Sequence, residues 1–131
     1  MPRYGAYDKN DNHTYAIGVF PSMELLAARP ESVRCLLVSP LCPVYGLGMA
    51  AVLALPAPLL SGCRGMNVPV EEAPRAVERI SGKENSWVVT VLNKYACSLD
   101  PAANHVVLHN PSDVGNAGTI LRSALGFGFK N

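Results

Sequence analysis

Short apolar runs of strand-like composition alternate along the chain with segments of helical composition, and this alternation constrains the fold more than any other feature. Each run is bounded by polar or turn-forming residues, as buried strands are. The predicted strands are residues 15–20, 33–38, 68–70 and 87–92. The predicted helices are residues 23–28, 47–55 and 71–80. We therefore predict an α/β fold and not a bundle or a barrel.

Helix-capping residues support two of these helices. Ser22 precedes the first helix and is its expected N-cap, because a serine hydroxyl satisfies a free backbone N–H group there. Gly82 follows the third helix and is its expected C-cap, since glycine adopts the left-handed conformation at little cost.

Length and composition limit the number of domains. The 131 residues suffice for one domain with a buried core, but two complete domains would be crowded. A hydrophobic content of 49% with only 16% charged residues indicates a packed protein and not a disordered one. The composition changes near residues 99–103, so we predict a polar lead-in over 1–12, an α/β domain over 13–100 and the start of a second domain over 101–131.

The net charge does not indicate a binding partner, whereas the cysteines and the first residues bear on the cellular location. The 11 Lys and Arg against 10 Asp and Glu give a net charge of +1, so any nucleic-acid site must be a local patch. The four cysteines show no CxxC spacing, and the first residues are polar and not a secretory signal. We expect reduced thiols in a cytoplasmic protein.

An uncharged run extends from Cys35 to Cys63 and is long enough to span a bilayer. Several prolines and glycines interrupt it, and a helix broken at those positions would leave backbone groups unpaired in lipid. We therefore expect no membrane span.

The last part of the chain predicts a strand over 105–109, a loop over 110–115 and a helix over 116–125 that ends at Gly126. Asn116 is the expected N-cap, and Arg122 lies roughly 9 Å further along the helix axis and about 120° around it. We expect one side of this helix to be buried and Arg122 to lie off that side. The residues expected to be buried are Ile120, Leu121, Ala124 and Leu125.

By position alone, Asn116 and Arg122 have ordinary roles. An asparagine at a helix start is usually a cap, and a helical arginine is usually solvated. The segment from Gly115 to Gly118 lacks the three-glycine spacing of a dinucleotide site. A nucleotide-binding fragment therefore stays an alternative only if this loop binds phosphate.

The segment HVVLHNPSDVGNAGTILRSALGFGFKN resembles the first motif of the SpoU/TrmH family of RNA ribose methyltransferases, within the SPOUT superfamily. Asn116, Gly118 and Arg122 match the core of that motif. The upstream segments GVFPSMELLAARPESVRCLLVSP and VERISGKENSWVVTVL resemble the family's RNA-recognition domain more weakly. The resemblance implies a ribosomal-protein-like three-layer α/β sandwich, followed by the first β-loop-α unit of a knotted catalytic domain.

The resemblance also implies an activity, namely methyl transfer from S-adenosylmethionine to a ribose 2′-hydroxyl of structured rRNA or tRNA. Asn116 and Arg122 would be the catalytic residues. A guanidinium is too weakly acidic to serve as a base at neutral pH, so we expect Arg122 to stabilise the developing alkoxide and hold a phosphate. Asn116 would orient the hydroxyl or the adjacent backbone.

Relatives bind the methyl donor with two later motifs, which do not occur in this sequence. We therefore expect no cofactor-binding residues within this chain, and no activity from the chain alone. The complete protein is expected to be a homodimer. An RNA-binding module that keeps the motif without the chemistry is the alternative.

Other residues offer weaker candidates. A basic set forms a candidate patch for RNA phosphates, although charges on helix ends are often only solvated. Its members are Arg75, Arg79, Lys83 and Lys94. Cys97, His105 and His109 are too few convergent ligands for a metal site, so we expect no metal. No histidine stands at a recognisable spacing from Ser112 or Ser123, which argues against a hydrolase.

Overall fold

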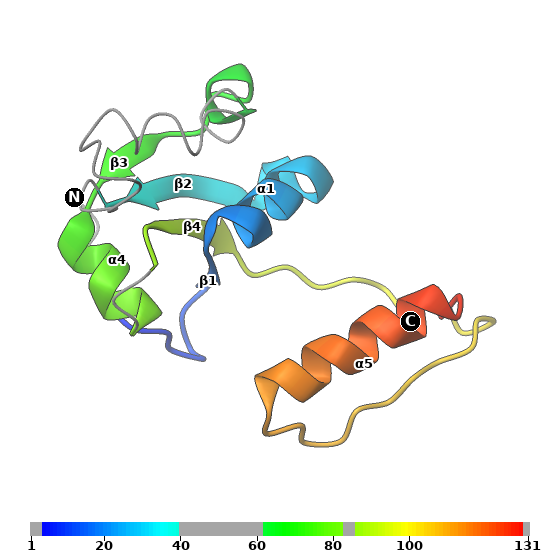
Figure 1. The fold of residues 1–131 in the computed structure, drawn as a ribbon. Coiled ribbons are helices and arrows are strands. Elements are labelled where there is room, and N and C mark those ends of the chain that lie inside the picture. The colour runs from blue at the N-terminus through cyan, green and yellow to red at the C-terminus, as the bar shows by residue number, and fades with distance from the viewer. Residues whose placement is uncertain (1–3, 40–61, 83–85, 130–131) are drawn as a thin grey trace. The chain divides into compact units, whose positions relative to one another are not determined.

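The computed structural model describes residues 4–39, 62–82 and 86–129. They form mixed α/β structure in two compact units, Met1–Tyr95 and Ala96–Asn131 (Figure 1). The boundary predicted after residue 100 thus falls inside the second unit. The helix predicted over 47–55 lies outside the described residues.

A four-stranded sheet organises the first unit, and the predicted α/β class is confirmed. The strands are β1 (His13–Ile17), β2 (Val33–Val38), β3 (Val70–Glu72) and β4 (Val88–Asn93). Their order in the sheet is β1-β4-β2-β3. Strand β4 pairs antiparallel with both β1 and β2, whereas β3 pairs parallel with β2 at the edge. The sheet is therefore mixed.

The strands predicted over 33–38 and 87–92 are confirmed, the second with a shift of one residue. The edge strand predicted over 68–70 begins at Val70 instead. The strand predicted over 15–20 was wrong at its end, because β1 stops at Ile17. Gly18 then adopts a φ of 107°, and this left-handed conformation turns the chain into a helix.

Helix α1 (Val19–Ala28) begins before the predicted start, and Ser22 is not its N-cap. Gly18 is the N-cap residue; Ser22 is buried inside the helix, where its hydroxyl donates a hydrogen bond to the Gly18 carbonyl at 2.7 Å. Pro21 is tolerated since it lies in the first turn, where no intrahelical partner for its missing N–H group is needed.

Helix α4 (Pro74–Ser81) is shorter than the helix predicted over 71–80. The first residues of that range belong to β3, whose backbone pairs with β2 and is thus unavailable to a helix. The predicted C-cap is confirmed, because Gly82 has a φ of 60° and its N–H donates to the Glu78 carbonyl.

The core has two clusters, one on each face of the sheet, because successive strand residues point to opposite faces. Helix α1 and a helical turn at residues 62–65 cover one face, and α4 covers the other. On the α1 side the buried residues are Leu26, Leu36, Cys63 and Val88. On the α4 side they are Cys35, Leu37, Val77, Val89 and Val91. Burial of each of the larger side chains stabilises the fold by about 1.5–3 kcal/mol.

In the second unit, helix α5 (Val114–Gly126) is the regular element. The strand predicted over 105–109 was wrong, as these residues lie outside any strand. A β-strand is defined by hydrogen bonds to a neighbouring strand, and no described segment pairs with this one. Within the described ranges, the structure contains no helix that is both long and apolar enough to cross a membrane. Most of the uncharged run from Cys35 to Cys63 lies outside those ranges.

Thr90 offers a test of the packing around β4. Its side chain is fully buried, and its hydroxyl finds no hydrogen-bond partner among the described residues. A buried unsatisfied hydroxyl costs about 1–3 kcal/mol, so Thr90→Val is expected to raise the free energy of unfolding by about 1 kcal/mol in urea denaturation. The matched variant Thr90→Ser keeps the hydroxyl but loses a methyl group, and should lower it by about 1 kcal/mol. A destabilised Thr90→Val would show that the hydroxyl has a partner.

Candidate functional site

The start of α5 carries the residues that the family motif singles out, and Asp113, not Asn116, caps the helix. The Asp113 carboxylate accepts a hydrogen bond from the backbone N–H of Asn116 at 2.7 Å. Asn116 is therefore the third helical residue, and its prediction as N-cap was wrong. Aspartate is as good a cap as asparagine, and here it stands at the position where the chain is still extended.

The two motif glycines differ in what surrounds them. A Cβ atom on Gly115 would lie 3.2 Å from a carboxylate oxygen of Asp113, so glycine leaves room for the cap. A Cβ atom on Gly118 would meet nothing within 4 Å. The helix itself therefore does not require a glycine at position 118, although alanine would favour it by about 1 kcal/mol.

The far end of α5 also differs from its prediction. The helix ends at Gly126, but the left-handed residue that stops it is Gly128, with a φ of 85°. The N–H groups of Gly128 and Phe129 donate to the carbonyls of Leu125 and Ala124, which is the pattern of a Schellman motif. Defined caps thus hold both ends of this helix.

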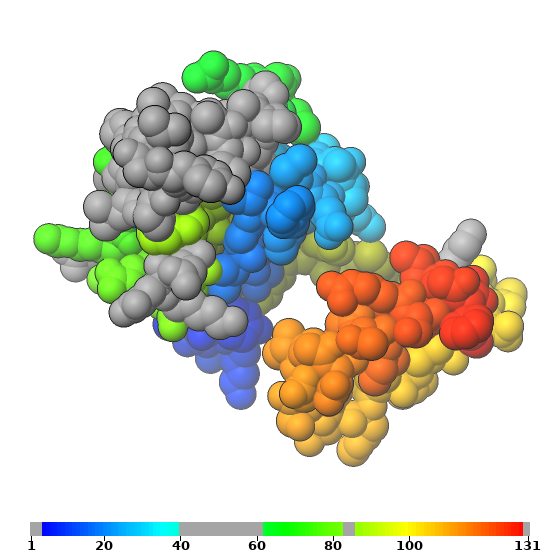
Figure 2. Space-filling model, viewed as in Figure 1, coloured from blue at the N-terminus to red at the C-terminus, as the bar shows by residue number. Residues whose placement is uncertain are grey.

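Both predicted catalytic residues, Asn116 and Arg122, are exposed on α5. The apolar side of the helix is exposed too, which contradicts the predicted burial. Ile120, Leu121 and Leu125 are 41%, 60% and 68% exposed, because the described part of the second unit places no packed layer against them. Figure 2 shows the orange to red surface of α5 open on the side in view. Asn116 and Arg122 are therefore both accessible, about 120° apart around the helix axis.

The capped start of α5 is a poor phosphate site. A helix N-terminus attracts anions through its free N–H groups and the helix dipole. Here the Asp113 carboxylate already accepts from one of these groups and adds a negative charge. The alternative of a nucleotide-binding fragment therefore gains no support from this loop.

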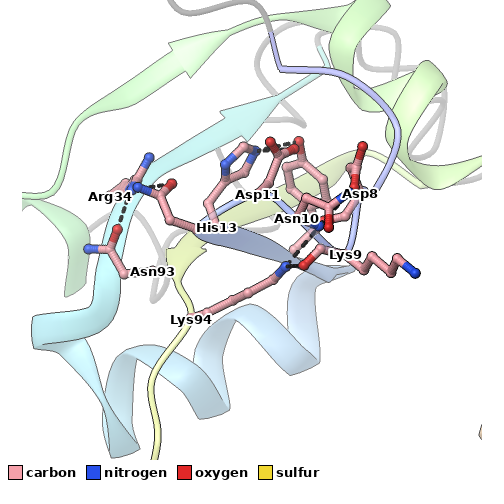
Figure 3. Close-up of polar contacts among 10 residues, drawn as sticks. Asp8, Lys9, Asn10, Asp11, His13, Arg34, Asn93 and Lys94 are labelled. Carbon is pink, nitrogen blue, oxygen red and sulfur yellow. Dashed lines mark hydrogen bonds and ion pairs between the residues drawn. The ribbon is translucent and has the colours of Figure 1, made fainter.

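Of the four predicted RNA-binding residues, the structure describes three, two on α4 and one directly after β4. Arg75 and Arg79 are exposed on α4, one turn apart and therefore on one side of that helix. Lys83 lies outside the described residues. Lys94 follows β4, and its ammonium group donates to the carbonyls of Asp8 and Lys9 at 3.1 and 2.9 Å (Figure 3).

Sequence reasoning missed Arg34. Its Nε–H group donates to the side-chain oxygen of Asn93, and its terminal nitrogen donates to that of Asn12 at 3.0 Å (Figure 3). These partners lie 59 and 22 residues away in the chain. No local pattern in the sequence reports such a contact, so only the sheet register reveals it.

A second group of titratable side chains, from β1, β2 and the N-terminal segment, lies around Tyr4. The Cys35 thiol is 3.5 Å from the Tyr4 hydroxyl, and a ring nitrogen of His13 is 3.0 Å from the Tyr15 hydroxyl. Burial, with the neighbouring thiol, raises the pKa of Tyr4 to about 12. Burial also raises the pKa of Cys35. A thiol with a raised pKa stays protonated at neutral pH, so this group does not make a cysteine nucleophile.

The metal candidates do not converge. Cys97, His105 and His109 are all exposed, and the described residues contain no group of three or more side chains suited to hold a metal ion. Comparison with known proteins adds no assignment: no protein-family model, no curated protein and no solved structure matches this chain.

The cap of α5 can be tested directly. Asp113→Ala removes the acceptor for the Asn116 N–H group and is expected to destabilise the first turn by about 1 kcal/mol. Faster amide hydrogen exchange at the start of α5, measured by NMR, would report this change. Asp113→Asn is the matched control and should leave exchange nearly unchanged. Equal exchange in all three proteins would contradict the capping role.

Proposed function

We propose that this chain supplies the RNA-recognition part and the first motif of an RNA ribose 2′-O-methyltransferase of the SpoU/TrmH type. The observation that carries the proposal is the exposure of Asn116 and Arg122 on one capped helix, within the sequence that resembles the family motif. The α/β sheet of the first unit, covered by helices on both faces, is compatible with the proposed ribosomal-protein-like sandwich. The expected substrate is structured rRNA or tRNA, and the expected location is the cytoplasm.

In this proposal Arg122 stabilises negative charge in the reaction and does not act as a base. The guanidinium keeps its proton at neutral pH and presents several N–H donors. It can therefore stabilise negative charge on the ribose oxygen and grip an adjacent phosphate through charge-assisted hydrogen bonds. Asn116 lies six residues earlier, roughly 9 Å along the helix axis, and can orient the same nucleotide from the other end of the site.

The methyl donor of the proposed reaction is S-adenosylmethionine, and helix α5 by itself offers no pocket for it. A site for such a ligand needs an enclosed, largely apolar pocket. No side chain of α5 is buried, and the Asp113 carboxylate occupies the helix start. The proposal therefore assigns donor binding to residues outside α5, and expects the complete enzyme to be a homodimer.

The exposed state of α5 also favours the second candidate, a non-catalytic RNA-binding module. With no buried residue on the helix, nothing in the described part of the second unit excludes water from Arg122. Methyl transfer to RNA by the complete protein is the property that separates the two candidates.

The catalytic assignment predicts a selective loss of activity. Arg122→Ala in the complete protein is expected to abolish transfer of labelled methyl groups to rRNA or tRNA, while RNA affinity changes less than threefold. The control Ser123→Ala changes the adjacent exposed residue and should keep full activity. Retained turnover in Arg122→Ala would refute the role of Arg122. Absence of methyl transfer in the unmodified protein, with RNA binding intact, would favour the module.

A further inference from the structure

The last residue of β4, Asn93, and the two residues that follow it, Lys94 and Tyr95, each contact a segment far away in the sequence. Asn93 accepts the hydrogen bond from Arg34. The ammonium of Lys94 lies 4.9 Å from the centroid of the Tyr7 ring, and the guanidinium of Arg29 lies 4.8 Å from that of Tyr95. Because consecutive Cα atoms are about 3.8 Å apart, the backbone of the three residues spans less than about 8 Å. We call the surface formed by these residues and their partners the β4-exit surface.

The guanidinium of Arg34 is held in place by hydrogen bonds to uncharged side chains. Arg34 is the extra residue of a β-bulge, since Val33 pairs with Leu92 and Cys35 with Val91. Side-chain oxygens of Asn12 and Asn93 fix its guanidinium, and no carboxylate among the described residues lies within ion-pair distance of it. Its positive charge and its remaining N–H donors are thus available to an anion such as a phosphate.

The two tyrosines supply flat surfaces next to two other cations, Lys94 at Tyr7 and Arg29 at Tyr95. Tyr7 and Tyr95 are 60% and 53% exposed, so their rings are accessible to a ligand. Exposed aromatic rings next to cations are the features with which proteins stack the bases of unpaired nucleotides and hold their phosphates. Duplex RNA, in contrast, keeps its bases stacked and unavailable.

Acidic groups limit the charge of the surface. Glu31 lies 3.7 Å from Arg29, and Asp11 lies 3.9 Å from His13. The carboxylate of Asp8 accepts from the backbone of Asn10 nearby. A non-specific electrostatic site would need a larger excess of cations. Stacking on the tyrosines must therefore contribute to binding alongside the phosphate contact.

We propose that the β4-exit surface binds unpaired nucleotides of an RNA, with a phosphate on Arg34 and bases on Tyr7 and Tyr95. This inference rests on the proposed function and names the site by which the chain recognises its substrate. In this proposal the β4-exit surface, and not a patch on α4, is the main RNA contact. Of the four basic residues predicted from the sequence, only Lys94 belongs to it.

The test measures binding of the whole chain to a fluorescently labelled 12-nucleotide RNA of mixed sequence by anisotropy, with a blunt duplex of the same sequence for comparison. Two variants remove the proposed contacts, and two matched controls remove the same chemistry elsewhere. They are Tyr95→Ala with control Phe20→Ala, and Arg34→Gln with control Arg75→Gln. Phe20 is 80% exposed on α1, and Arg75 is exposed on α4.

We expect the single strand to bind more tightly than the duplex. Tyr95→Ala should weaken binding at least fivefold, and Arg34→Gln should also reduce the slope of log Kd against log salt by about 0.7, the value for one phosphate on a single strand. Both controls should stay within twofold. If Arg34→Gln unfolds, as thermal melting would show, the pair of aromatic variants decides.

The results that would overturn the proposal fall into two distinguishable kinds. RNA binding that Tyr95→Ala and Arg34→Gln leave within twofold, or that the controls weaken equally, rejects the β4-exit surface but keeps RNA recognition. Preference for the duplex rejects it likewise. Failure of the unmodified chain to bind any RNA rejects both this surface and the recognition role in the proposed function.

Discussion

The pairing of β4 with strands on both sides is the interaction on which the first unit depends. This strand joins β1 to β2, and every residue from Val88 to Leu92 is buried. Its alternating side chains enter the core clusters on the two faces, so both helix layers need it in place. At the end of this strand, Asn93 accepts a hydrogen bond from Arg34, and the next residue, Lys94, donates one to the N-terminal segment. Both the packing of the core and the β4-exit surface therefore depend on the pairing of β4.

The second unit follows a different constraint. Its helix is defined by local signals, an aspartate cap at the start and a Schellman motif at the end, and not by burial. A helix of 13 residues gains modest stability from such local terms alone. The apolar residues that would normally stabilise it by packing are exposed. In the proposed enzyme, further structure of the catalytic domain would cover them.

The sequence predicts the buried strands well and the residues that cap the helices less well. The runs VRCLLV and WVVTVL predict β2 and β4 because β-branched and apolar residues bounded by polar ones have few alternatives. Gly18 and Asp113 displaced the expected caps Ser22 and Asn116, since capping depends on where the backbone leaves the extended conformation. The contacts of Arg34 depend on strand register across 59 residues, which no local window contains.

An NMR titration of the labelled chain with a structured tRNA tests the central claim, recognition of RNA by this chain, most directly. We expect saturable amide shifts at residues 7–12, 29–34 and 93–95 of the first unit, and smaller ones near Asn116 and Arg122. Residues of α4 should shift little. Spectra that do not change up to about 100 μM RNA, well above the range of about 10⁻⁸–10⁻¹¹ M typical of specific nucleic-acid complexes, would contradict it.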